Sequence, residues 1–143
     1  MSIESIKKRI IAIDYGTKRI GLAKSDPFQM FAQPVGTYDE PSLMQELEKI
    51  ASSDGIECFL VGYPKNSDDT ENRMTTVVDR FVERLQSQYP NIPIEKIDEF
   101  GSSRQAGALL RQSGTRKKQR QKKGRLDQAV AAMLLQSYLE HSL

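Results

Sequence analysis

The chain has 143 residues, of which 38% are hydrophobic and 28% charged, and its formal net charge at pH 7 is +2. This composition is typical of a folded globular protein and excludes disorder throughout the chain. No run approaches the roughly 20 consecutive apolar residues of a membrane span, and the first residues do not resemble a signal peptide, so we expect a cytoplasmic protein without a membrane partner.

Three strands are predicted in the first quarter of the chain. Short apolar runs separated by turn residues place them at about 9–14, 20–25 and 31–38. The short connections favour antiparallel pairing, so we expect a meander. The first strand ends on a carboxylate, Asp14. A charge at the mouth of a buried strand needs a partner, and a metal ion is one candidate.

Helices and strands alternate through the middle of the chain. Pro41 and apolar residues at helical spacing predict a helix over 41–53, followed by a strand over 57–63. A second helix is predicted over 69–89. Proline residues after it end the helix, and a strand is predicted over 94–98. These strands need helical crossovers, which favour parallel pairing.

Two further helices are predicted near the carboxyl end, over 103–112 and 125–141, with the basic stretch 116–123 as a surface loop between them. The order of elements therefore predicts one α/β domain spanning residues 1–143. Its sheet would be mixed and five-stranded, with the antiparallel meander first and helices on both faces.

Charge is strongly segregated along the sequence. Residues 39–99 carry fourteen acidic and six basic side chains, a balance of 6 − 14 = −8, whereas residues 102–126 carry nine basic side chains and no acidic ones. The basic segment should attract phosphate groups, although a solvated helix face followed by a mobile loop is the alternative. Its basic residues are Arg104, Arg111, Arg116, Lys117, Lys118, Arg120, Lys122, Lys123 and Arg125.

Three acidic positions are candidates for one site. Asp14 ends the first predicted strand, Asp98 and Glu99 end the last one, and Asp127 lies on the apolar stripe of the final helix, at its start. Carboxylates that meet in a partly buried cleft must take up protons or bind a cation, and oxygen ligands favour magnesium or manganese. Structural roles are the alternatives: an Asx turn for Asp14, an exposed strand end for Glu99 and a helix cap for Asp127.

Four motifs in this order resemble the YqgF family of RNase H-like nucleases. They are Ile13-Asp14-Tyr15-Gly16-Thr17-Lys18-Arg19-Ile20-Gly21-Leu22-Ala23, Val61-Gly62-Tyr63-Pro64, Asp98-Glu99 and Leu126-Asp127-Gln128-Ala129-Val130-Ala131-Ala132. The resemblance covers nearly the whole chain and includes a segment rich in arginine and lysine before the last acid. It implies an RNase H-like fold.

The resemblance also implies a function in ribosome biogenesis, as a nuclease that matures the 5′ end of pre-16S ribosomal RNA. Resolution of Holliday junctions in DNA recombination is the alternative. Asp14, Glu99 and Asp127 match the catalytic, metal-binding acids of the family, and its basic approach to the final acid is matched by Lys122, Lys123 and Arg125. One departure is the sequence Phe100-Gly101-Ser102-Ser103-Arg104, which stands where the family commonly has Arg followed by Ser or Thr.

Hydrolysis assisted by two Mg²⁺ or Mn²⁺ ions is the hypothesis for the mechanism, with Asp14 bridging the ions and Glu99 and Asp127 each holding one. The basic residues from Arg116 to Arg125 would bind the flanking phosphates of pre-rRNA or branched DNA. Lys18 and Arg19, in the turn after Asp14, would contact the same backbone, and Arg104 could replace the missing loop arginine. Ribosomal precursor particles are expected partners of a monomer or weak homodimer.

Two other functions compete with cleavage. The sequence Asp14-Tyr15-Gly16-Thr17 also resembles the phosphate-binding hairpin of sugar kinases, actin and heat-shock ATPases, but those proteins need a second domain of the same kind that 143 residues cannot supply. A module that binds nucleic acid and regulates transcription without cutting is the third reading. Metal-dependent cleavage distinguishes that module from a nuclease.

Overall fold

The computed structural model describes residues 7–64, 72–98 and 119–141, and for 119–126 it describes the backbone only. The predicted helix over 103–112 therefore lies outside the described residues, as do the acid Glu99 and the altered loop that follows it. The same holds for Arg104, Arg111, Arg116, Lys117 and Lys118, and for the side chains of Arg120, Lys122, Lys123 and Arg125.

The first three strands form the predicted antiparallel meander. They are β1 (Arg9–Asp14), β2 (Ile20–Ser25) and β3 (Ala32–Tyr38). In the register of β1 with β2, Asp14 lies opposite Gly21, and in that of β2 with β3, Ile20 lies opposite Tyr38. The end of β1 and the start of β2 are therefore at the same edge of the sheet.

The other two strands are parallel to β1 and complete a mixed sheet. They are β4 (Ile56–Tyr63) and β5 (Ile94–Asp98), and the strand order is β3-β2-β1-β4-β5. The mixed five-stranded sheet is confirmed. Since β1, β4 and β5 run in the same direction, their carboxyl ends lie along one edge, which we call the Asp14 edge.

Two helices cover one face of this sheet. α1 (Glu40–Ser53) begins one residue before its predicted start, and the Asp39 side chain caps it by accepting a hydrogen bond from the amide of Ser42. α2 (Arg73–Gln88) begins later than predicted because Asn72 forms a capping box with Thr75, which fixes the first turn there.

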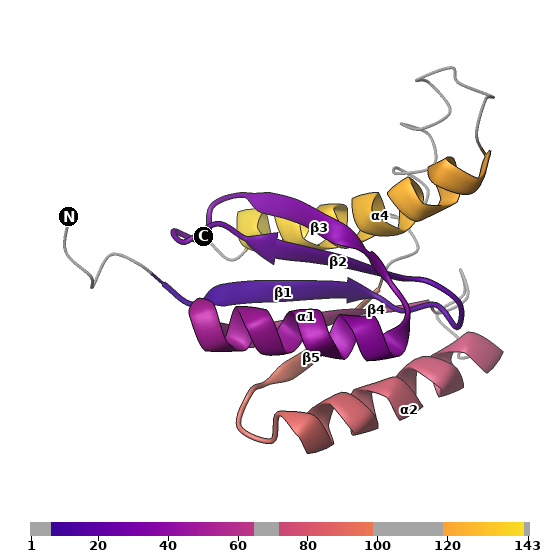
Figure 1. Cartoon of the computed structure of the whole chain (residues 1–143), viewed down its shortest axis with the longest axis horizontal. Helices are drawn as coiled ribbons and strands as arrows, with labels where there is room; N and C mark the ends of the chain where they lie inside the picture. The colour runs from indigo at the N-terminus through magenta and orange to yellow at the C-terminus, as the bar shows by residue number, and fades with distance from the viewer. Residues whose placement is uncertain (1–6, 65–71, 99–118, 142–143) are drawn as a thin grey trace.

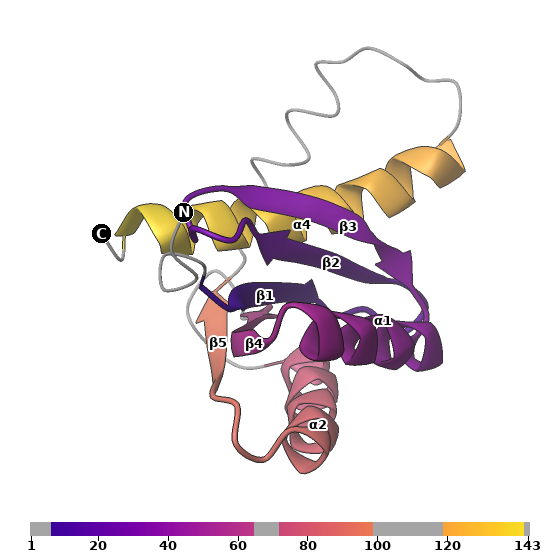
Figure 2. The same ribbon diagram turned by 60° about the vertical axis from the view of Figure 1, so that its left-hand side comes forward.

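The helix α4 (Gln119–His141) covers the opposite face and starts earlier than predicted. The expected loop over 116–123 is wrong from Gln119 onwards, because those residues form the first turns of the helix. Glutamine, arginine and lysine are good helix formers, and one internal glycine is tolerated once packing of the later turns has nucleated the helix. Figures 1 and 2 show these turns continuing past the strands at the Asp14 edge.

The sheet thus has two differently packed faces (Figures 1 and 2). Alternate residues of β1 point to opposite sides: Ile11 and Ile13 join the core under α1 and α2, whereas Ile10 and Ala12 join the core under α4. Helices on both faces were predicted and are confirmed. Among the described residues, no helix is long and apolar enough to cross a membrane.

Candidate active site

Two of the predicted acidic positions lie where parallel strands end. Asp14 is the last residue of β1 and Asp98 is the last residue of β5, with β4 between them. The expectation that these strand ends share one edge is confirmed. Glu99, the acid chosen as a ligand, follows Asp98 in the sequence but lies outside the described residues.

Asp127 reaches the same edge from the opposite direction, on α4. A Cβ atom added to Gly21 would overlap the backbone carbonyl of Asp127, so α4 lies directly on the sheet at this point. Gly21 is also the register partner of Asp14. The side chain of Asp14 continues the row of Ile10 and Ala12 beneath α4, because side chains alternate along a strand. Gly21 therefore brings the two acids to one place.

The surroundings of Asp127 differ from those expected for a helix cap. The residue lies inside α4 rather than at its start, so the capping alternative is excluded. Its side chain is 22% exposed, and the Nε atom of Arg19 donates a hydrogen bond to its Oδ2 atom over 3.0 Å. Burial raises the pKa of the Asp127 carboxyl above its ordinary value, and the Arg19 guanidinium opposes that rise.

This pairing gives Arg19 a role that its sequence position did not predict. Arg19 was expected to contact phosphate, yet here its described partner is Asp127, 108 positions away. A carboxylate on an apolar helix stripe is a signal that a cationic partner exists, but it does not say which one. Lys18, the neighbouring residue in the turn, is exposed at the Asp14 edge as a phosphate contact requires.

The donors that are described fit a hard divalent cation in kind. Asp14 and Asp127 supply carboxylate oxygens, and oxygen ligands suit Mg²⁺ or Mn²⁺ rather than zinc. Within the described side chains no group of three or more possible ligands is assembled. A third ligand would have to come from elsewhere, and the predicted one is Glu99, directly after β5.

A polar network on the opposite face holds the residue next to Asp14. The Tyr15 ring stacks on Phe81 with centroids 4.3 Å apart, and its hydroxyl donates to Oε1 of Glu40 over 2.9 Å. Arg84 donates from Nε and Nη2 to the two Glu40 oxygens, over 2.8 and 2.9 Å. The network ties the turn after Asp14 to both α1 and α2. No local sequence pattern predicts this network, because its contacts join three separate elements.

Electrostatics in this network follow from the same contacts. Hydrogen bonds from Arg84 hold the pKa of the Glu40 carboxyl below its ordinary value. Burial raises the pKa of Tyr15, and its hydrogen bond to the Glu40 carboxylate adds to that rise. Glu40 is therefore ionised at neutral pH and Tyr15 is not.

The part of the basic segment from Gln119 onwards belongs to α4. The helix backbone begins at Gln119, eight residues before Asp127, which corresponds to roughly 12 Å at 1.5 Å per residue. Arg120, Lys122, Lys123 and Arg125 are thus carried on helical turns that precede an acid of the site.

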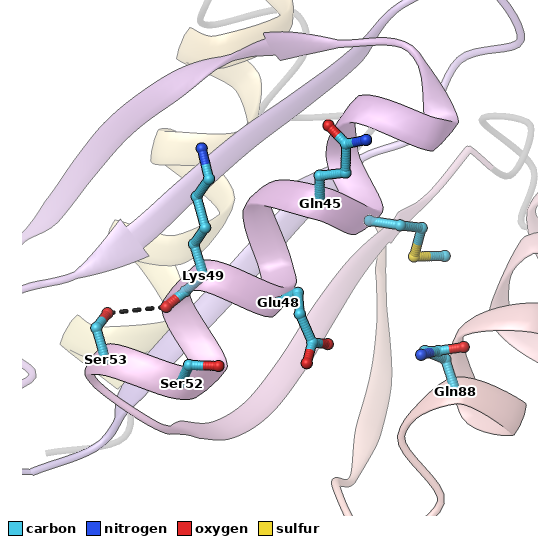
Figure 3. A pocket seen from close by; sticks show the side chains of 7 residues that line it. Gln45, Glu48, Lys49, Ser52, Ser53 and Gln88 are labelled. Atoms are coloured by element: carbon cyan, nitrogen blue, oxygen red, sulfur yellow. Dashed lines mark hydrogen bonds between the residues drawn. The ribbon is translucent and has the colours of Figure 1, made fainter.

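A hollow of about 850 Å³ lies elsewhere, between α1 and the end of α2 (Figure 3). Its lining comes from α1 apart from Gln88 of α2, and Figure 3 shows Glu48, Lys49 and Gln88 around it. The hollow is on the face opposite α4. It contains none of the residues predicted to bind metal or nucleic acid, so it is separate from the candidate site.

The chain is similar to known proteins over nearly its whole length. The family model described as "RuvX: Holliday junction resolvase" matches residues 8–141. A protein of Prosthecochloris aestuarii named "Putative pre-16S rRNA nuclease" is 54% identical over 136 residues, covering 95% of this chain and 96% of the relative. A protein of Salinibacter ruber with the same name is 37% identical over 142 residues, covering 99% of both chains.

The fold also has a counterpart among solved structures. The structure described as "T. thermophilus RuvC in complex with Holliday junction substrate" superposes with a TM-score of 0.51, and the match covers 94% of this chain and 95% of that one. The two sequences are only 11% identical, so the likeness concerns the RNase H-like fold and not the individual residues.

Proposed function

The chain belongs to the RuvX family, to which the YqgF resemblance pointed, and on that basis we propose that it is a metal-dependent nuclease that hydrolyses phosphodiester bonds of nucleic acids. The observation that carries the proposal is the convergence of Asp14 and Asp127 at Gly21, because it places two carboxylates at one edge of an RNase H-like sheet. Its natural substrate would be pre-16S rRNA, as the names of its relatives indicate, and the YqgF resemblance implies maturation of the 5′ end.

The protein residues have separate tasks in this reaction. Asp14 and Asp127, with Glu99 as the third ligand, would hold one or two Mg²⁺ or Mn²⁺ ions. Such ions supply a water of lowered pKa and neutralise charge on the leaving oxygen. Lys18 would contact a phosphate oxygen next to the scissile bond, from the turn that follows Asp14.

Substrate binding would extend along the start of α4. The basic residues Arg120, Lys122, Lys123 and Arg125 precede Asp127 on the same helix, so a nucleic-acid backbone contacting them would lead into the acidic site. Arg104, Arg116, Lys117 and Lys118 would extend this contact. Recognition of phosphates in this way depends on backbone shape more than on base sequence.

Resolution of Holliday junctions is the second candidate, favoured by the description of the family model. A resolvase cuts two strands symmetrically and therefore normally acts as a dimer, whereas trimming an RNA end requires only one site. Maturing ribosomal particles would be the cellular partner in the first case and branched DNA in the second. Cleavage products and oligomeric state together separate these two functions.

The test compares two substrates under one set of conditions. Labelled RNA containing the precursor 5′ sequence and a synthetic four-way DNA junction are incubated with Mg²⁺ or Mn²⁺, using wild type and Asp14→Asn. We expect RNA cleavage that falls at least about 1,000-fold in Asp14→Asn, because this variant keeps the shape of the residue but loses its charge. Its circular dichroism spectrum and unfolding midpoint should stay close to those of wild type.

Asp54→Asn provides the matched control. Asp54 is also a partly buried carboxylate paired with an arginine, Arg9, over 3.4 Å, but it lies at the opposite end of the sheet. Its replacement should leave cleavage unchanged. Paired cuts in the junction without RNA cleavage would favour the resolvase. Binding of either substrate without cleavage would contradict the nuclease function and favour a module that binds nucleic acid and regulates transcription.

A further inference from the structure

We propose that Arg19 is an exchangeable positioning residue, which holds the carboxylate of Asp127 before a divalent cation binds and then pairs with a phosphate oxygen of the nucleic acid. This inference rests on the proposed function, because it assigns Asp127 to metal binding. It adds an order of events: the same guanidinium serves two partners in succession. Arg19 would therefore couple loading of the acidic site to capture of the substrate.

The two partners in the ion pair are unequally exposed. The Asp127 side chain is 22% exposed, whereas the Arg19 side chain is 46% exposed. A carboxylate that has lost most of its hydration is stabilised in its ionised form by a cation near it. Asp127 is held by α4 against Gly21, so Arg19 is the partner that can leave.

Release of Arg19 has a small energetic cost. The described contact joins one nitrogen, Nε, to one oxygen, Oδ2, over 3.0 Å. Partly exposed pairs of this kind shift an equilibrium by at most about fivefold, because solvent screens the attraction and ordering the side chain opposes it. A divalent cation competes easily with such a partner.

The position of Arg19 keeps it near the site after release. Arg19 directly precedes Ile20, the first residue of β2, and two residues later Gly21 lies between Asp14 and Asp127. A guanidinium anchored there remains at the Asp14 edge whichever partner it has. Its planar set of N–H donors matches the geometry of a phosphate group.

The test uses Arg19→Gln with Arg9→Gln as the matched control. Arg9 also pairs through Nε with an Oδ2 atom, that of Asp54, but at the other end of the sheet. Calorimetric titration with Mn²⁺ in the absence of nucleic acid should give about two- to fivefold tighter binding for Arg19→Gln, since its competitor for Asp127 is gone. Arg9→Gln should bind Mn²⁺ as wild type does.

Two further measurements detect the exchange itself. In wild type, the NMR signal of the Arg19 Nε–H group should shift as Mg²⁺ is added. Binding of nucleic acid is measured in the Asp14→Asn background, which prevents cleavage. There, Arg19→Gln should lower the steepness of the plot of log binding constant against log salt concentration by about 0.7 to 0.9, as expected for loss of one phosphate contact. Arg19→Lys keeps the charge and should restore most of that slope.

The outcomes separate this inference from the proposed function. If wild type cleaves and binds Mn²⁺ but Arg19→Gln changes neither the metal affinity nor the salt dependence, the proposed exchange of Arg19 between partners is wrong. The proposed nuclease function would then still stand. Weaker Mn²⁺ binding in Arg19→Gln would also overturn it, because the arginine would then support the metal rather than compete with it. Absence of metal binding by wild type would overturn both.

Discussion

The two faces of the sheet are packed in different ways. The face under α1 and α2 is filled by large side chains, including Phe59 and Phe81, which are fully buried. The face under α4 also contains large side chains, such as Leu60 and Leu135, but it is distinguished by small residues, namely Ala12, Ala23, Ala131 and Gly21. Large side chains bury more apolar area, whereas small ones let a helix backbone approach the sheet. We infer that the first face mainly supplies stability and the second mainly positions the site.

The position of Asp14 depends on both faces of the sheet. Its side chain belongs to the α4 row, but the next residue, Tyr15, stacks on Phe81 of α2 and bonds to Glu40 of α1. The α1/α2 face thus fixes the backbone that carries an acid presented to the α4 face. Substitutions on the two faces should therefore differ in whether they change stability or cleavage.

Among substitutions that test the packing of the two faces, the largest effect is expected for Gly21→Ala, which breaks the close approach on the α4 face. The new methyl group would overlap the backbone of Asp127, so α4 must move and carry Asp127 away from Asp14. Misplacement of about 1 Å in a site costs on the order of 100-fold in rate, and we expect at least that loss of cleavage. Steady-state cleavage assays, corrected for the folded fraction, would measure it.

Gly36→Ala is the control for this prediction. A Cβ at Gly36, on the neighbouring strand, would approach the ring end of Tyr38, a side chain that can turn away, rather than a helix backbone. Cleavage by this variant should stay within a few-fold of wild type. Cleavage by Gly21→Ala at the rate of wild type would contradict the role given to the contact between α4 and Gly21.

On the α1/α2 face, Leu85→Ala should lower stability without changing chemistry. Leu85 is fully buried on α2, and removing such a side chain costs about 2 to 5 kcal/mol of the free energy of unfolding. Denaturant unfolding measures this loss, and the cleavage rate per folded molecule should remain that of wild type. A specific loss of cleavage at full folding would mean that this face also controls the site directly.

The smallest effect concerns the pH dependence of the Tyr15 network. Because Arg84 lowers the pKa of Glu40 in the folded state below its ordinary value of 4.5, the unfolded state binds the proton more readily. The resulting stability is fully present above the ordinary pKa and is lost as the pH falls through the lowered one. For a partly exposed pair it amounts to at most about 1 kcal/mol.

Glu40→Gln tests this assignment. The variant has no carboxyl at position 40 to protonate, so its free energy of unfolding should fall less than that of wild type between about pH 5 and pH 3. Unfolding curves in denaturant at several pH values would show the difference. Parallel curves for the two proteins would exclude Glu40 as a source of acid sensitivity.

Local sequence determined most of the secondary structure. The bounds of β1, β2 and β5 were predicted to the residue, because alternating burial and turn residues act between near neighbours in the chain. The same patterns placed Asp14 and Asp98 at strand ends, and parallel pairing through crossovers brought those ends to one edge. The family followed from motifs that are themselves short and local.

Tertiary structure decided which residues lie together at the candidate site. The pairing of Arg19 with Asp127 and the joining of Tyr15, Glu40 and Arg84 link residues from 25 to 108 positions apart. Local patterns are compatible with many partners at such distances, because the partner depends on where each helix packs on the sheet. The early start of α4 likewise depends on packing of its later turns against the sheet. The sequence therefore specified which carboxylates could form a site, and packing of α4 on Gly21 brought Asp127 to the edge of the sheet where Asp14 ends β1.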